Sequence, residues 1–222
     1  MGRSGDDESL GGTSPCLLHT LDGDGRPIGD EQQRRDVDRW RKSERERLLA
    51  VRQALTPDYR AAETTTIEAA LDALLPGTRR IVSVYWPIRG EPDLRGWMKR
   101  RVLAGLGVAL PVATALGAPM TFRLWTPEGR VERGLWRIPY PADGAEVVPD
   151  AVIAPLVGYD PSCFRLGYGG GFFDRTLAGY ASKPLVIGVG YRECAIATVY
   201  PQPHDIPMDH IVPGSGAPLA RV

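Results

Sequence analysis

The amino-acid sequence predicts an α/β fold: a three-layer α/β/α domain with a mostly parallel central sheet and helices on both faces. The first observation behind this prediction is that helical segments alternate along the chain with short apolar strands, the order typical of layered α/β proteins. The second is size, because 222 residues, of which 43% are hydrophobic, suffice for one such domain and its core.

The folded domain is expected to occupy residues 34–222. Residues 1–33 are rich in Gly, Asp, Ser and Pro and show no apolar periodicity, so we expect a disordered tail there. From Asp36 to Leu55 the chain lacks Gly and Pro and predicts the first helix. Basic side chains crowd this helix, and the residues alone favour a solvated face with i,i+4 ion pairs.

The remaining elements follow in order. Thr56 can cap a second helix that has proline at its first position and ends at Pro76-Gly77. Asp93 can cap a third helix, and a further short helix can follow the glycine-rich segment. The third helix is expected over residues 94–102 and the short helix over residues 176–180. Strands are expected over residues 81–86, 107–111, 120–125, 147–157 and 185–191.

Composition excludes several classes of function. Basic and acidic residues both number 27, and the resulting zero net charge argues against a nucleic-acid binder. No apolar run reaches the roughly 20 residues that a membrane helix needs, and the first residues lack the order of a signal peptide. The three cysteines, Cys16, Cys163 and Cys194, are too scattered to indicate a disulfide framework or a zinc site. We expect a cytoplasmic monomer.

The most informative stretch is Arg165–Arg175, where four glycines fall within five positions. An apolar run precedes it and a short helix can follow, and this order points backbone N–H groups at an anion. Neither a P-loop nor a dinucleotide fingerprint fits the spacing. The residues leave open a plain glycine-rich surface turn, although Arg165, Asp174 and Arg175 add side chains that pair with phosphate or metal.

Parallel sheets bind their ligands at the carboxyl ends of their strands, so the ends of the expected strands at Trp86 and Val157 are the places to look for further candidate residues. Glu91 could accept two parallel N–H bonds from a planar heterocycle, or it could favour the dipole of the next helix. Asp174, Asp205 and Asp209 could hold Mg²⁺ beside phosphates. Cys163 could be an activated thiol, but a buried thiol is favoured.

Four motifs together resemble the 5-formyltetrahydrofolate cyclo-ligase (methenyltetrahydrofolate synthetase) family. The strongest is R-L-G-Y-G-G-G-F-F-D-R at Arg165–Arg175, close to the R-L-G-x-G-x-G-Y-Y-D of that family. The others are Y-W-P-I-R-G-E-P-D-L at Tyr85–Leu94, A-P-L-V-G-Y-D at Ala154–Asp160 and H-D-I-P-M-D at His204–Asp209. Phe172-Phe173 departs from the usual Tyr-Tyr and removes two hydroxyl groups.

The resemblance implies an ATP-dependent ligase of one-carbon metabolism that closes 5-formyltetrahydrofolate to 5,10-methenyltetrahydrofolate and releases ADP and phosphate. It implies that Arg165 and Tyr168 take part in catalysis and that Asp174 and Asp205 hold Mg²⁺. The implied ATP-binding residues are Arg41, Lys42, Arg45, Arg165, Leu166, Gly167, Gly169, Gly170, Gly171, Phe173 and Asp174. The implied folate-binding residues are Trp86, Glu91, Tyr168, Gly169, Gly170, Gly171 and Phe172.

Two alternatives remain open from the residues. The chain could be a phosphotransferase that uses the same phosphate loop on another acceptor, or a non-catalytic relative that binds folate or nucleotide. Glu91 favours a pterin over a sugar, because a sugar presents no pair of planar N–H donors. Arg165, Asp174 and Asp205 argue against a purely binding role.

Overall fold

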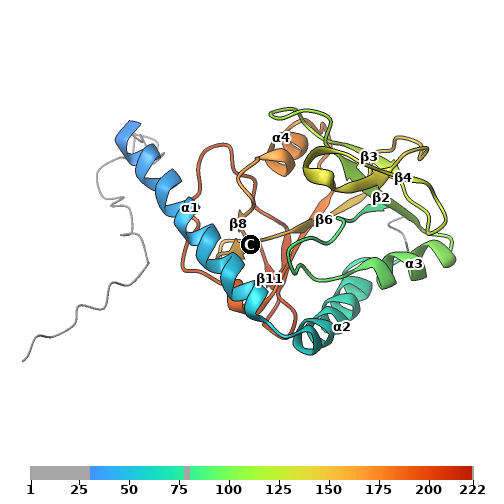
Figure 1. Cartoon of the computed structure of the whole chain (residues 1–222), viewed down its shortest axis with the longest axis horizontal. Helices are drawn as coiled ribbons and strands as arrows, with labels where there is room; N and C mark the ends of the chain where they lie inside the picture. The colour runs from blue at the N-terminus through green and yellow to red at the C-terminus, as the bar shows by residue number, and fades with distance from the viewer. Residues whose placement is uncertain (1–30, 78–80, 222) are drawn as a thin grey trace, which may run out of the picture.

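A computed structural model describes residues 31–77 and 81–221, so residues 1–30 of the tail predicted over residues 1–33 lie outside the described residues. Its centre is a seven-stranded sheet with the order β11-β10-β9-β6-β1-β2-β3. Figure 1 labels β2, β3, β6 and β11 of this sheet. The inner strands pair in parallel, and β3 and β11 pair antiparallel at the two edges. The strands are β1 (Ile81–Ser83), β2 (Gly107–Val112), β3 (Thr121–Leu124), β6 (Ala151–Pro155), β9 (Leu185–Val189), β10 (His210–Val212) and β11 (Leu219–Ala220).

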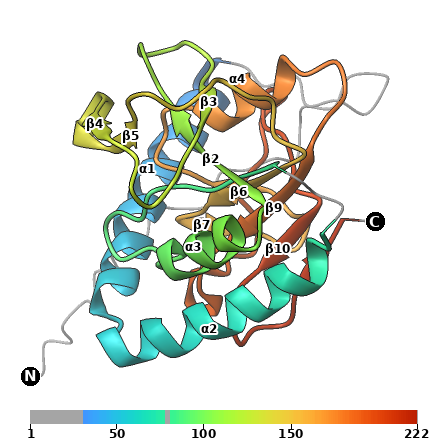
Figure 2. The ribbon, with the colours of Figure 1, turned by 90° about the vertical axis from the view of Figure 1, so that its right-hand side faces the viewer.

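Helices cover both faces of this sheet, as predicted. On one face α2 (Pro57–Leu74) and α3 (Arg95–Leu103) pack through residues such as Leu71 and Trp97 on Val82, Ile153 and their neighbours. Figure 2 shows α2 and α3 together on this side. On the other face α4 (Phe172–Ala178) packs through Leu177. The three-layer α/β/α prediction is confirmed.

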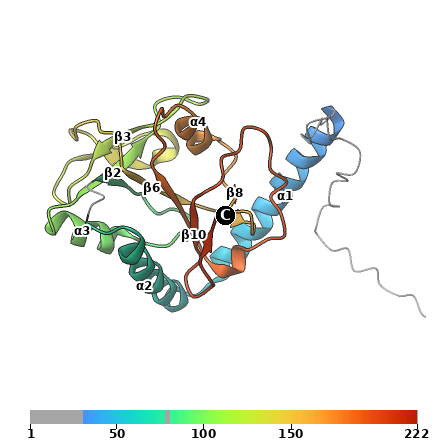
Figure 3. The same cartoon turned by 180° about the vertical axis from the view of Figure 1, so that it is seen from behind.

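The first helix, α1 (Glu31–Ala54), lies beyond the carboxyl end of β6 rather than on a face of the sheet. Its Leu48 packs with Val157, Leu166 and Val199 in a separate cluster. Figures 1 and 3 show it beside the small β7–β8 hairpin, Gly158–Tyr159 and Arg165–Leu166. It begins at Glu31, so residues 31–33, which we expected in the tail, are helical.

The sheet reverses its winding between β1 and β6. From β1 the chain crosses through α3 to β2 on one side, whereas β6 pairs with β1 on the other side. A crevice opens outside the carboxyl ends of the strands at such a switch point, and α/β proteins bind their ligands there. The fold therefore places the loop after β1 and the segment after β6 on opposite sides of one crevice.

Several elements differ from the prediction. The strand expected over residues 81–86 ends at Ser83, because the chain leaves the ladder ahead of Pro87, which has no N–H to donate. The strands β10 and β11 and the hairpin β4–β5 (Val131–Arg133, Pro139–Pro141) were not predicted. Each is only two or three residues long, so its pairing depends on its neighbours more than on its own sequence.

Replacing Leu71 by Ala is expected to lower the free energy of unfolding by about 2–5 kcal/mol, because it leaves a cavity under α2. Leu71 is fully buried, whereas Leu103 at the end of α3 is 85% exposed. Leu103→Ala is the matched control and is expected to change the value by at most about 0.5 kcal/mol. Urea denaturation followed by circular dichroism measures both, and equal losses would contradict the packing described.

Candidate functional site

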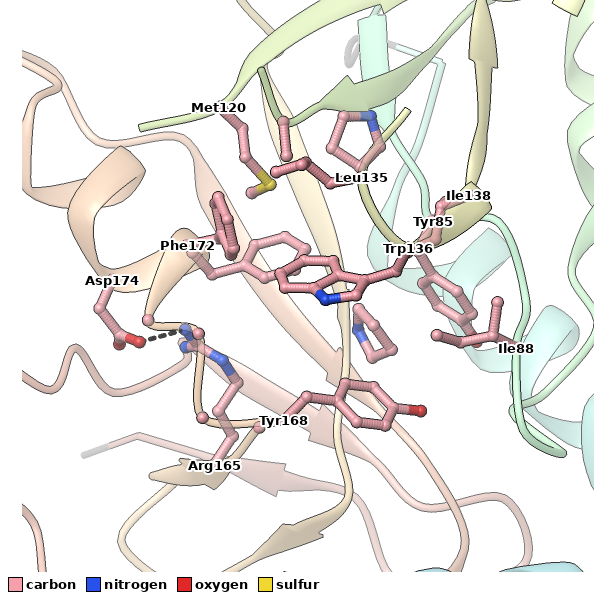
Figure 4. A pocket seen from close by; sticks show the side chains of 18 of the residues that line it. Tyr85, Ile88, Met120, Leu135, Trp136, Ile138, Arg165, Tyr168, Phe172 and Asp174 are labelled. Atoms are coloured by element: carbon pink, nitrogen blue, oxygen red, sulfur yellow. Dashed lines mark hydrogen bonds and ion pairs between the residues drawn. The ribbon is translucent and has the colours of Figure 1, made fainter. Parts of the chain in front are cut away.

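A cavity of about 390 Å³ occupies the crevice. Its walls are the loop after β1, the ends of β2 and β6, the glycine segment 167–171 and the β4–β5 hairpin. Figure 4 shows Arg165 and Asp174 on one side, the ring of Tyr168 below, and the indole of Trp136 between Phe172 and Tyr168. Both places that the sequence singled out, the carboxyl ends of the expected strands at Trp86 and Val157, therefore belong to one site.

The glycine segment is not joined directly to β6, which corrects the strand–loop–helix order expected from the sequence. The β7–β8 hairpin intervenes, and Arg165 and Leu166 are themselves a strand. Gly169 and Gly171 have φ of 90° and 61°, a conformation that side chains rarely adopt. A Cβ on Gly170 would come within 2.8 Å of the Phe172 ring. The conformation of the loop and its packing on Phe172 thus require glycine.

Two arginines reach the cavity from one face of α1. Arg45 donates through Nε to the Gly167 carbonyl at 2.7 Å, and its guanidinium lies against Gly169. Burial lowers the pKa of Arg45, and the nearby charge of Arg41 lowers it further. Lys42 is exposed and is not on the cavity wall, so the structure does not bring it to the site with the other two.

Each of the two carboxylates at the arginine-rich side of the cavity, Asp174 and Asp205, accepts hydrogen bonds from an arginine. Asp174 accepts from Arg165 Nη2 at 2.9 Å and from the Ile206 N–H at 3.1 Å. Asp205 accepts from the Arg41 guanidinium and from the Gln202 N–H. Burial lowers the pKa of Arg165, and the charge of Asp174 opposes that shift. These pairs keep buried charges neutralised in the structure.

These carboxylates fit Mg²⁺ by donor chemistry. Hard oxygen donors from one or two acids, completed by phosphate oxygens and water, are what Mg²⁺ prefers. Among residues 31–77 and 81–221, no group of three or more His, Cys, Asp or Glu side chains could form a metal site alone. The third acid, Asp209, accepts from the Val186 N–H at 2.8 Å and lies near Arg221, and it is not on the cavity wall.

Glu91 is buried on the opposite side of the cavity. Its Oε2 accepts from the Ile88 N–H at 2.9 Å and its Oε1 from the Tyr168 hydroxyl at 2.7 Å. Burial raises the pKa of Glu91, while both hydrogen bonds and the charges of Arg52 and Arg89 lower it. A carboxylate has about four acceptor positions, so two stay available to a ligand. The alternative role at the start of α3 is not supported, because the first turn of α3 contains no acidic residue and Glu91 lies on the cavity wall.

Aromatic side chains form much of the remaining wall. Trp136 adopts a left-handed φ of 53° and stands edge-on to Phe172, with ring centroids 5.3 Å apart. No local pattern in the sequence indicates that the hairpin that carries Trp136 folds over the cavity. Met120 on the cavity wall and Arg52, which donates to the lining residue Tyr168, were also missed, because only the tertiary fold brings them near the site. Cys163 is buried, so the favoured buried thiol is confirmed, and burial raises its pKa.

Comparison with known proteins decides the family. A sequence model of the 5-formyltetrahydrofolate cyclo-ligase family matches residues 37–214. The chain belongs to this family. It is 30% identical over 174 residues to the 5-formyltetrahydrofolate cyclo-ligase of Mycolicibacterium smegmatis, with 74% of this chain and 89% of the relative covered. It is 33% identical over 142 residues to the Escherichia coli K12 cyclo-ligase, covering 59% and 76% of the two chains.

The fold of this cyclo-ligase family member is also that of solved structures. The 5,10-methenyltetrahydrofolate synthetase of Aquifex aeolicus superposes with a TM-score of 0.70 at 25% identity, covering 81% of this chain and 92% of the other. A 5,10-methenyltetrahydrofolate synthetase from Mycoplasma pneumoniae has the same fold, with a TM-score of 0.64 at 20% identity and 78% and 97% covered. No helix within residues 31–77 and 81–221 has the length and apolar character to cross a membrane.

The cyclo-ligase site brings together nearly every residue that the resemblance implied. Apart from Lys42, all the predicted ATP-binding, folate-binding, catalytic and metal-binding residues lie on the wall of this one cavity: Arg41, Arg45, Trp86, Glu91, Arg165, Leu166, Gly167, Tyr168, Gly169, Gly170, Gly171, Phe172, Phe173, Asp174 and Asp205. Their individual roles remain predictions.

Proposed function

We propose that the protein is an ATP-dependent 5-formyltetrahydrofolate cyclo-ligase that forms 5,10-methenyltetrahydrofolate, ADP and phosphate. The observation that carries the proposal is that the glycine segment lies between two different sets of binding groups. On one side of Tyr168 lie the arginines and acids of the phosphate-binding end, and on the other lies the buried Glu91. Family membership supports the same activity.

ATP would bind at the arginine-rich end. Backbone N–H groups of Gly169, Gly170 and Gly171 can approach phosphate oxygens closely, because no side chain stands in the way. Arg41, Arg45 and Arg165 would supply positive charge. Arg41 now donates to Asp205, and Arg165 donates to Asp174. A triphosphate could replace these two carboxylates as the acceptor of both arginines. The released carboxylates of Asp174 and Asp205 would then be available to hold Mg²⁺, which neutralises phosphate charge when bound.

The folate would bind with its pterin ring at Glu91. The ring presents two parallel N–H donors, and Glu91 offers one free acceptor position on each oxygen for them. Trp86, Phe172 and Tyr168 provide apolar and aromatic wall. In this orientation the formyl group of the substrate would point toward the glycine segment, where the γ-phosphate would lie.

The reaction then requires positioning and charge stabilisation more than a covalent protein group. The formyl oxygen attacks the γ-phosphorus, the bond to the β-phosphate oxygen breaks, and ADP leaves. The N10 nitrogen adds to the activated formyl carbon and loses its proton, and the carbon–oxygen bond breaks to release phosphate. Arg165 would stabilise the charge on the transferring phosphoryl group. Tyr168 would hold Glu91, whose carboxylate binds the folate, in place through its hydroxyl.

We also propose that the enzyme works in the cytoplasm as a monomer. Cys163 and Cys194 are free thiols in the structure, which is consistent with a reducing compartment. Sedimentation at the mass of two 24.2-kDa chains would contradict the monomer.

Mixing the protein with Mg·ATP and 5-formyltetrahydrofolate is expected to produce 5,10-methenyltetrahydrofolate, with ADP formed in equal amount. Methenylfolate formation is followed by absorbance and ADP by chromatography. ADP release without methenylfolate would favour phosphoryl transfer to another acceptor. ATP binding without any product would overturn the proposed ligase activity.

Replacing Glu91 by Gln is expected to weaken folate binding by about 10-fold or more, because the charged acceptor of two N–H groups is lost. The wild-type carboxylate has a pKa raised by burial, so folate affinity should fall as the pH drops toward that raised pKa, at a higher pH than for an exposed glutamate. Calorimetric titration at several pH values measures this. Glu91→Gln should bind folate with little pH dependence, and an effect on ATP alone would count against the pterin role.

Replacing Asp174 by Asn is expected to abolish turnover and to remove most of the Mg²⁺ dependence of nucleotide binding. The amide oxygen can still accept from the Ile206 N–H, but the charge that serves the metal is lost. Circular dichroism verifies folding. Asp209→Asn is the matched control, because Asp209 lies off the cavity wall, and it is expected to keep Mg²⁺-dependent nucleotide binding. Wild-type turnover in Asp174→Asn would exclude Asp174 as a metal ligand.

A further inference from the structure

Arg52 in the last turns of α1 is a buried charge that the proposed mechanism does not use. Its side chain is 1% exposed, and it lies on the same helix face as Arg45, seven residues earlier. Its guanidinium donates to the Arg89 carbonyl at 3.0 Å, the Leu156 carbonyl at 3.1 Å and the Tyr168 hydroxyl at 2.5 Å. It thus joins the loop after β1, the end of β6 and the glycine segment.

These three acceptors are neutral oxygens, so the buried charge of Arg52 is compensated indirectly. Arginine has donors only, and the Tyr168 oxygen must therefore accept from it. The single phenolic hydrogen of Tyr168 then goes to Glu91 at 2.7 Å. The result is a directed chain from Arg52 through Tyr168 to Glu91, in which one hydroxyl separates a buried cation from a buried anion. Such a chain favours the charged carboxylate at Glu91.

Tyr168 also belongs to the glycine segment. On its two sides, the Gly167 carbonyl accepts from Arg45 at 2.7 Å, and Gly169 lies against the same guanidinium. Arg45 therefore holds the backbone of the loop while Arg52 holds the side chain of Tyr168. A ligand that orders this backbone must also restrict Tyr168. A ligand that hydrogen-bonds to Glu91 must also affect the hydrogen bond that the Tyr168 hydroxyl donates to Glu91.

We propose that Arg52 is a positioning residue that acts through Tyr168 and couples the two substrate sites. Nucleotide on the glycine segment fixes Tyr168 and through it Glu91, so that nucleotide and folate each bind more tightly when the other is present. The coupling is reciprocal, because a change in affinity through a shared element is the same in both directions. This inference rests on the proposed function, since it takes nucleotide at the loop and pterin at Glu91.

The test measures the Kd of 5-formyltetrahydrofolate by calorimetry with and without Mg·β,γ-imido-ATP, which cannot transfer its γ-phosphate. In the wild type the nucleotide is expected to tighten folate binding by about 5-fold or more. In Tyr168→Phe the ratio of the two Kd values is expected to fall to about one, because the ring stays and only the hydroxyl is lost. Arg52→Met should lose the ratio likewise, and the double variant should lose no more than Tyr168→Phe alone.

The matched control is Tyr59→Phe. It also removes a hydrogen bond from a tyrosine to a glutamate, the 2.6 Å bond to Glu193, but neither residue lies on the cavity wall. It should keep the wild-type ratio. If Arg52 and Tyr168 only support the fold, their variants will lower the Tm and weaken both Kd values while the ratio stays, and this overturns the proposal. A wild-type ratio of one overturns the coupling alone. A wild type that binds neither ligand overturns the proposed function and the coupling with it.

Discussion

Buried charge is the constraint on which this site depends. Arg165, Arg52 and Glu91 are all largely removed from water, and an isolated charge in such a place would cost several kcal/mol. The glycine segment and the residues on either side of it provide a partner for each of these three charges. Asp174 neutralises Arg165 directly, and the Tyr168 hydroxyl links Arg52 to Glu91. The loop therefore forms a wall of the cavity, and its side chains also fix the positions of the buried charged groups around it.

The arrangement of the sheet explains why these groups meet. The reversal between β1 and β6 opens the crevice, and the chain segments that leave these strands carry Glu91 on one side and the glycine segment on the other. The first helix then crosses the end of the sheet and adds arginines from one face. A helix whose basic residues look solvated in the sequence is thus partly turned inward, with Leu48 packed between the levels of Arg45 and Arg52.

Much of this was predictable from local patterns. The apolar runs at residues 107–111 and 185–191, the Thr56-Pro57 start of α2 and the density of glycine before Phe172 each carry their own physical cause. The contributions of Arg52 and Trp136 were not predictable. Arg52 is one of many arginines in its helix, and only the packing of α1 selects it for burial. Trp136 reaches the cavity because a hairpin of three-residue strands folds over it, and no periodicity marks such strands.

The β7–β8 hairpin that carries the glycine segment is a sheet of its own, with two residues in each strand. Few backbone hydrogen bonds hold it, whereas β6 and β9 pair over five residues in the central sheet. Elements with so few bonds open at a lower free energy than the core to which they are attached. The amides that would contact phosphate should accordingly exchange their hydrogens long before those of β6. A weakly paired stretch of backbone would then lie beside the neutralised charges of Arg165 and Asp174.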